Sequence, residues 1–176
     1  MISLLPVLVI VSAAQLGQPI IIKTPQMEID LTPRTANQMA SFYEARGFPK
    51  AMRDVISSQC FITVGITNTS DARIWHDLAN WTFTAAGKAI SREHRDAWKK
   101  RWQAMGMPRS KQATFRWTLI PESLDYLPGE HEGGNIVLPF TEGYFTVTAT
   151  FATGDDKQGK PITISSDKLF CAEDPQ

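Results

Sequence analysis

Three histidines, His76, His94 and His131, are the residues of this sequence best suited to metal chemistry. His131 lies between Glu130 and Glu132 in a glycine-rich segment, and an imidazole with carboxylates beside it is a ligand set for zinc or copper. The three histidines have no ligand spacing among themselves, so such a site requires a second histidine to fold close to His131. A periplasmic copper- or zinc-binding protein, with His131, Glu130 and Glu132 as ligands, is therefore the second hypothesis for this chain.

Signatures of covalent and phosphate chemistry are absent from the sequence. No Gly-x-Ser-x-Gly motif marks an activated serine, and neither cysteine has neighbours that lower a thiol pKa. The pair Gly133-Gly134 precedes an extended segment, whereas a phosphate-binding loop precedes a helix. An enzyme of unknown class is therefore the third hypothesis, and we expect no cofactor.

Charge is distributed unevenly along the chain, although the formal net charge of the 176 residues is zero. Residues 88–116 hold nine basic and two acidic side chains, whereas residues 117–176 hold ten acidic and three basic ones. Five of the basic residues fall on one predicted helix, and these are Arg92, Arg95, Lys99, Lys100 and Arg101. This face is either a solvated helix surface or a contact surface for an acidic partner, which it would attract by electrostatic steering. The zero net charge argues against nucleic acid as the partner.

The first fourteen residues have the pattern of a signal peptide. Residues 2–14 form an apolar run that is too short for a transmembrane helix. The run ends in Ser12, Ala13 and Ala14, small residues suited to cleavage after Ala14, although no Lys or Arg precedes it. We therefore expect a periplasmic or secreted protein without a transmembrane segment.

The two cysteines, Cys60 and Cys171, fit an exported protein with one structural disulfide. Closing a loop of this length stabilises the folded state by up to roughly 4–5 kcal/mol in the chain-entropy view. The sequence has no C-x-x-C motif, so a redox pair is the weaker interpretation. The predicted Cys60–Cys171 bond would bracket most of the strand-like part of the chain.

Two segments have helical patterns. Near the N-terminus, an extended run at 19–31 precedes a helix from Thr32, as N-cap, to about Arg46, and a second short helix follows at 49–57. In the middle, residues 91–105 predict a helix capped by Ser91. Its apolar stripe, at spacings of four, four, four and three, consists of Ile90, His94, Trp98, Trp102 and Met105. We expect this stripe to dock on the β-core, with a ligand groove as the alternative.

The remaining segments alternate with period two and predict strands at 60–69, 72–84, 114–120, 135–140, 143–153 and 161–171, with a long connection at 121–134. The fold class is therefore mainly β, a β-sandwich with helices added near the N-terminus and in the middle. The expected organisation is a signal peptide at 1–14, a strand and helical segment at 15–58, and the sandwich at 59–176 with a helical insert at 91–105.

This order of elements, together with the turn at Pro128, Gly129 and Glu130, resembles immunoglobulin-like sandwich modules of exported bacterial proteins. The resemblance is architectural and implies no particular functional residue. With a signal peptide and no catalytic signature, the leading hypothesis is an exported, non-catalytic accessory or protein-binding module of the bacterial cell envelope. Its partner would be another envelope protein of acidic character, bound by the basic helix face or by an unpaired sheet edge.

Overall fold

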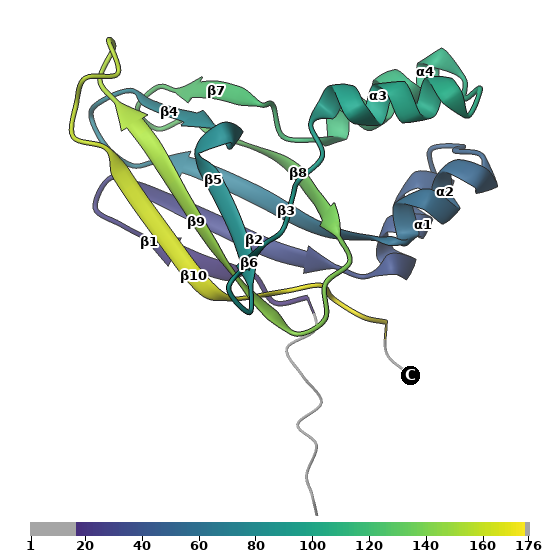
Figure 1. Ribbon diagram of the computed structural model, residues 1–176. Helices are drawn as coiled ribbons and strands as arrows, with labels where there is room; N and C mark the ends of the chain where they lie inside the picture. The colour runs from purple at the N-terminus through teal and green to yellow at the C-terminus, as the bar shows by residue number, and fades with distance from the viewer. Residues whose placement is uncertain (1–16, 175–176) are drawn as a thin grey trace, which may run out of the picture.

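Segments with alternating apolar residues form two β-sheets in the computed structural model, which describes residues 17–174. Within these residues the chain is mainly β, with four α-helices on one side of the sheets (Figure 1). The predicted signal peptide at 1–14 lies outside the described residues. None of the helices within residues 17–174 has the length and apolar character needed to cross a membrane.

The first sheet has four antiparallel strands in the order β1-β2-β3-β8. These strands are β1 (Ile20–Lys23), β2 (Met27–Arg34), β3 (Gln59–Asn68) and β8 (His131–Pro139). The predicted strand at 60–69 is confirmed as β3, which pairs with β2 on one side and with β8 on the other over almost its whole length. Apolar side chains on one face of β3 enter the space between the sheets, whereas Phe61 faces the helices.

The second sheet is built around β9 (Tyr144–Thr153). β10 (Ile162–Phe170) pairs along one edge of β9, while β5 (Trp81–Ala85) and β4 (Ile74–Asp77) pair with it at different positions along the chain. Two short strands, β6 (Lys88–Ala89) and β7 (Ser123–Tyr126), extend the sheet beyond β5 and β4. The short 3₁₀-helix η1 (Leu78–Asn80) separates β4 from β5 within the run predicted at 72–84.

The inter-sheet core is a continuous cluster of buried apolar side chains from both sheets. It includes Ile29, Val64, Val147, Phe151 and Ile164. Cys60 and Cys171 belong to the same cluster, and their sulfur atoms lie at bonding distance, 2.15 Å. The predicted disulfide is therefore confirmed, and it ties the start of β3 to the segment that follows β10.

The helical core is a second buried cluster, in which the helices cover part of the outer face of the four-stranded sheet. The helices are α1 (Ala36–Glu44), α2 (Lys50–Ser57), α3 (Arg95–Ala104) and α4 (Arg109–Thr118). The aromatic members of the cluster are Tyr43, Phe48, Phe61, Trp98, Trp102 and Phe115. The structure confirms the predicted helix at 49–57, which corresponds to α2.

The predicted start of the first helix was wrong by several residues. Thr32 and Pro33 belong to β2, which extends past the last residue paired with β1, so the missing N–H of Pro33 faces no neighbouring strand on that side. The true N-cap is Thr35, whose side chain accepts a hydrogen bond from the backbone N–H of Gln38. The side-chain oxygen of Gln38 in turn accepts a hydrogen bond from the backbone N–H of Thr35, which completes a capping box.

The middle of the chain contains the largest corrections. The helix predicted at 91–105 begins only at Arg95, with His94 rather than Ser91 as its N-cap. The strand predicted at 114–120 is wrong, because most of this segment belongs to α4, which buries Phe115 in the helical core. The connection predicted at 121–134 contains β7 and the first residues of β8, so the strand predicted from 135 starts earlier, at His131.

Candidate functional site

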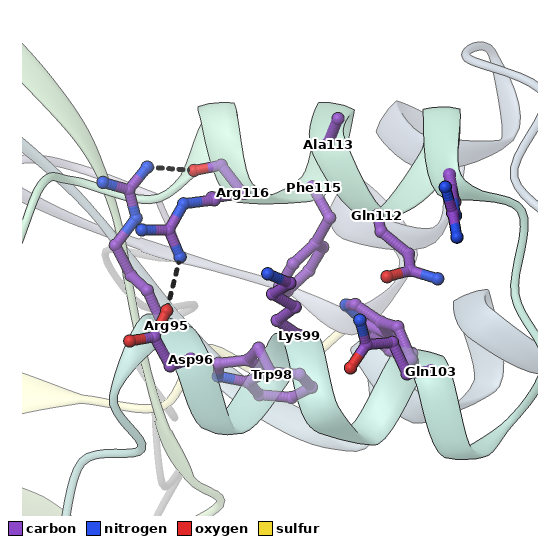
Figure 2. A pocket seen from close by; sticks show the side chains of 11 residues that line it. Arg95, Asp96, Trp98, Lys99, Gln103, Gln112, Ala113, Phe115 and Arg116 are labelled. Atoms are coloured by element: carbon purple, nitrogen blue, oxygen red, sulfur yellow. Dashed lines mark hydrogen bonds and ion pairs between the residues drawn. The ribbon is translucent and has the colours of Figure 1, made fainter.

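A groove lies between α3 and α4 (Figure 2). The two helices form a hairpin because Gly106, with a φ of +66°, ends α3 and Pro108 precedes α4. The groove has a volume of about 610 Å³, which is within the range of binding pockets for small ligands. It is lined by Arg95, Asp96, Trp98, Lys99, Trp102, Gln103, Arg109, Gln112, Ala113, Phe115 and Arg116.

Aromatic rings form the floor of the groove. The ring centroids of Trp98 and Trp102 are 5.4 Å apart, and each lies 5.2 Å from the centroid of Phe115. Tyr43 of α1 extends this cluster, and its hydroxyl lies 2.6 Å from the Thr118 hydroxyl of α4. Burial raises the pKa of Tyr43 to about 12, so this phenol stays neutral and serves as a packing and hydrogen-bonding group. The floor is therefore fixed on three helices.

Positive charge dominates the walls. Lys99 and Arg95 come from α3, Arg109 and Arg116 come from α4, and Asp96 is the one carboxylate among the lining residues. In Figure 2 the Arg95 guanidinium reaches across the groove and donates to the backbone carbonyl of Arg116. The Arg116 guanidinium donates in turn to Asp96 Oδ1 at 2.9 Å. One end of the groove therefore places two guanidinium groups beside a single carboxylate.

The electrostatics of this end show an excess of positive charge. Burial lowers the pKa of Arg95, and the neighbouring charge of Arg116 lowers it further. The hydrogen bond from Arg116 lowers the pKa of Asp96, so this carboxylate is ionised. Glu122 also acts on Arg95, but its charge is paired with Arg92. Two guanidinium groups and Lys99 therefore face Asp96 and an already paired carboxylate, so an additional anion would be stabilised here.

Several buried N–H groups at the site have no hydrogen-bond partner among residues 17–174. They include the indole Nε1 atoms of Trp98 and Trp102 and the Nε atom of Arg95. Trp98 and Trp102 are each only 1% exposed, so their N–H groups are removed from bulk water. A buried donor without an acceptor costs about 1–3 kcal/mol, so these groups lower the stability of the helical core.

The five basic residues predicted as a contact face do not act as one patch. Arg95 and Lys99 line the groove, whereas Lys100 is exposed outside it. Arg92 donates to both oxygens of Glu122, with Nη1 at 3.1 Å, and so fixes the start of α3 to the segment before β7. Arg101 pairs with Glu93 and lies over the Trp98 ring, 4.5 Å from its centroid. Arg92 and Arg101 are therefore structural residues with satisfied charges.

Sequence reasoning missed the wall that α4 provides. No element is predicted for Arg109, Gln112 and Ala113, and Arg116 falls in the strand predicted at 114–120, although Pro108 is a helix-start signal. The spacing of these residues along the chain, three, one and three positions, places all four on one helical face. This spacing is the signal that identifies the wall.

The three residues predicted as a metal site point in different directions. The His131 Nδ1 atom lies 2.8 Å from the Thr67 hydroxyl on β3, and the Glu130 side chain turns back to accept from the N–H of Leu127 at 2.7 Å. Neighbouring strand residues face opposite sides of a sheet, so Glu132 points away from His131. Within residues 17–174, no three His, Cys, Asp or Glu side chains gather as a metal site would require.

The other two histidines have structural roles. His94, predicted to pack on an apolar stripe, instead caps α3 by accepting from the N–H of Asp96 at 3.1 Å, and it is exposed. His76, on β4, is buried, with Nε2 2.8 Å from the Pro121 carbonyl and Nδ1 2.9 Å from the Tyr126 hydroxyl. A carbonyl only accepts, so Nε2 carries the proton and Tyr126 donates to Nδ1.

Comparisons of the chain with protein-family models, with curated proteins and with solved structures find no match. Any functional conclusion therefore depends on the groove and on the chemistry of the residues that line it.

Proposed function

We propose that this protein is an exported, non-catalytic binding module of the bacterial cell envelope, and that the groove between α3 and α4 receives an acidic partner protein. Export is supported by the pattern of residues 1–14 and by the disulfide between Cys60 and Cys171. The proposed architecture is a β-sandwich that resembles immunoglobulin-like modules. The helices are the part that contacts the partner.

The observation that carries the proposal is the combination of an aromatic floor with cationic walls. Protein interfaces depend most on tryptophan, tyrosine and arginine at their centres, and the groove concentrates these chemistries in one hollow. Four cations against one carboxylate favour a partner of opposite charge, both in encounter and in choice of partner. The groove supplies positive charge, N–H donors and aromatic surface, which together suit the binding of an anionic protein segment.

An exposed aromatic side chain extends this surface. Trp117 is 84% exposed, the largest exposed fraction among the exposed large apolar residues. It follows Ala113 by four residues, so it lies next to Ala113 on the surface of α4, at the rim of the groove. An exposed tryptophan beside a cationic groove is the kind of anchor that a partner protein buries.

A charge-reversal pair tests the proposal. Lys99→Glu/Arg109→Glu reverses two groove cations, whereas Lys160→Glu/Lys168→Glu makes the same change in net charge at exposed positions outside the groove. The tagged, oxidised protein and both variants are used to capture proteins from a cross-linked envelope fraction, and the captured proteins are quantified by mass spectrometry. We expect the groove variant to lose an acidic protein by at least about tenfold, equivalent to about 1.4 kcal/mol, while the control variant retains it. Equal capture by all three proteins would contradict the proposal.

A further inference from the structure

We infer that the groove binds an extended acidic segment with the pattern acidic-x-aromatic-x-acidic, in which two carboxylates flank one aromatic side chain on the same face. This inference rests on the proposed function and names the part of the partner that enters the groove. It follows from three features of the groove, namely the spacing of its cations, its aromatic centre and the incomplete charge pairing at one end.

The spacing of the cations fits an extended chain. Arg95 and Arg116 lie together at one end of the groove (Figure 2). Arg109 is the first residue of α4, next to the turn of the helix hairpin, and lines the groove there. The seven residues from Arg109 to Arg116 rise about 10 Å along the helix axis. In an extended segment, residues i and i+4 are about 13 Å apart and point to the same side. Two acidic side chains at these positions would therefore reach both cationic ends, given the length of arginine side chains.

The centre of the groove fits an aromatic side chain. Residue i+2 of the same segment would lie over the exposed Ala113, where an aromatic ring can make cation–π contacts with Lys99 and Arg109. The rings of Trp98, Trp102 and Phe115, each 1% exposed, close the floor beneath it. Trp102 is 99% buried, borders the groove, and its Nε1–H has no acceptor among the described residues.

The end beside the sheets fits an additional carboxylate. Asp96 is the sole carboxylate among the lining residues and pairs with Arg116, while Arg95 Nε is buried without a partner. A carboxylate from the segment would form charge-assisted bonds with these guanidinium groups, in competition with Asp96. Removal of the Asp96 charge should therefore strengthen binding of the segment. A variant that merely loses structure would bind the segment more weakly.

Labelled synthetic peptides test the inference by fluorescence anisotropy with the full oxidised protein at low ionic strength. The probe contains Glu-Ser-Phe-Ser-Glu between glycines, and the matched control Glu-Phe-Ser-Ser-Glu has the same composition with the aromatic residue on the opposite face. A third peptide replaces both glutamates by glutamine, and a fourth replaces phenylalanine by alanine. We expect the probe to bind at least about fivefold more tightly than each of the other three peptides. Asp96→Asn should tighten its binding about threefold, and Lys99→Glu/Arg109→Glu should abolish it.

The outcomes separate failure of the inference from failure of the proposed function. If the probe and its permuted control bind equally and both lose binding in Lys99→Glu/Arg109→Glu, the proposed pattern is wrong while an acidic partner in the groove stands. If Asp96→Asn weakens binding of the probe, the predicted competition for the arginine end is wrong. If no peptide binds but anionic lipid vesicles do, and the groove variant loses them, both the pattern and the protein partner are wrong.

Discussion

The inter-sheet core and the helical core of this protein differ in how completely they are closed. Between the sheets, His76 bonds to Tyr126 and Pro121, and Asn68 donates to two backbone carbonyls, while the indole N–H of Trp81 has no partner among the described residues. The helical core has two such indole N–H groups, those of Trp98 and Trp102, and it borders an open groove. The disulfide lies in the inter-sheet core.

This difference indicates that the two cores have different roles. The sheets and the disulfide supply a closed structure that does not need a ligand, while the helices hold aromatic rings and cations around a hollow. Buried N–H groups without partners cost stability in the free protein. Function is therefore to be sought where the packing of this molecule is incomplete, on the helical side.

Truncating a phenylalanine to alanine in each core measures how closely each core is packed. Phe151 is fully buried between the sheets, where neighbouring strands restrict collapse of the cavity. We expect Phe151→Ala to lower the free energy of unfolding by about 4–5 kcal/mol, at the upper end for such substitutions. Urea unfolding followed by circular dichroism measures the loss.

The matched substitution in the helical core should cost less. Phe115 is equally buried but borders the groove, so α3 and α4 can move together when its ring is removed. We expect Phe115→Ala to cost about 3 kcal/mol, since the cost depends on how far the site can collapse. A loss as large as that of Phe151→Ala would show that the helical core is as rigid as the inter-sheet core.

Acidic pH should lower the free energy of unfolding through the buried His76. Burial lowers the pKa of His76 below 6.5, its value in the unfolded chain, so the unfolded state binds the extra proton first. The contribution to stability is complete above pH 6.5 and is lost as the pH falls below it, by at most about 1.4 kcal/mol per pH unit. Urea midpoints between pH 7.5 and 5 measure this change.

His76→Gln is the control, because it should abolish the dependence on pH in this window. Glu122 does not interfere there. Burial alone would raise its pKa, but hydrogen bonds from Arg92 and from the N–H of Arg95 lower it below 4.5. Its contribution is therefore present above pH 4.5 and lost at more acidic pH. If the slope between pH 7.5 and 5 persists in His76→Gln, another group is responsible.

The smallest expected effect on stability comes from the groove itself. Lys99 and Arg109 form no ion pair with residues 17–174, so Lys99→Glu/Arg109→Glu should change the free energy of unfolding by less than about 0.5 kcal/mol. Lys100→Glu changes a residue of the same helix outside the groove. Its free energy of unfolding should change as little as that of the double variant, but it should still bind the partner. A clear loss of stability in the double variant would mean that these cations are structural.

Much of the β-structure could be predicted from the sequence, because period-two alternation survives in the strands that line the inter-sheet core. β3, β9 and β10 were found in this way, and the two cysteines allowed only one pairing. The predicted bounds of an element were wrong where two sequence signals favoured different boundaries. Thr32-Pro33 looks like a helix start, but the capping box at Thr35 and Gln38 makes two reciprocal bonds and sets the true boundary.

The candidate site could be predicted only in part. Trp98, Trp102, Arg95 and Lys99 were placed on a helix from their spacing, and the groove was present as an alternative. Its second wall was not, because Thr114, Phe115 and Trp117 favour strands by intrinsic propensity, whereas packing of Phe115 on Tyr43 and the indoles stabilises the helix. The pairing of Arg92 and Arg101 with glutamates also depends on tertiary structure.

The most direct measurement is site-specific photo-crosslinking in the intact envelope. A photoreactive phenylalanine analogue replaces Gln103, which lines the groove, or Thr163, which is exposed on β10, and crosslinked products are compared with and without Lys99→Glu/Arg109→Glu. The account predicts an acidic protein crosslinked from position 103, absent from position 163 and lost when the two cations are reversed. An identical product from both positions, or one that persists after charge reversal, would contradict the claim that the groove is the binding surface.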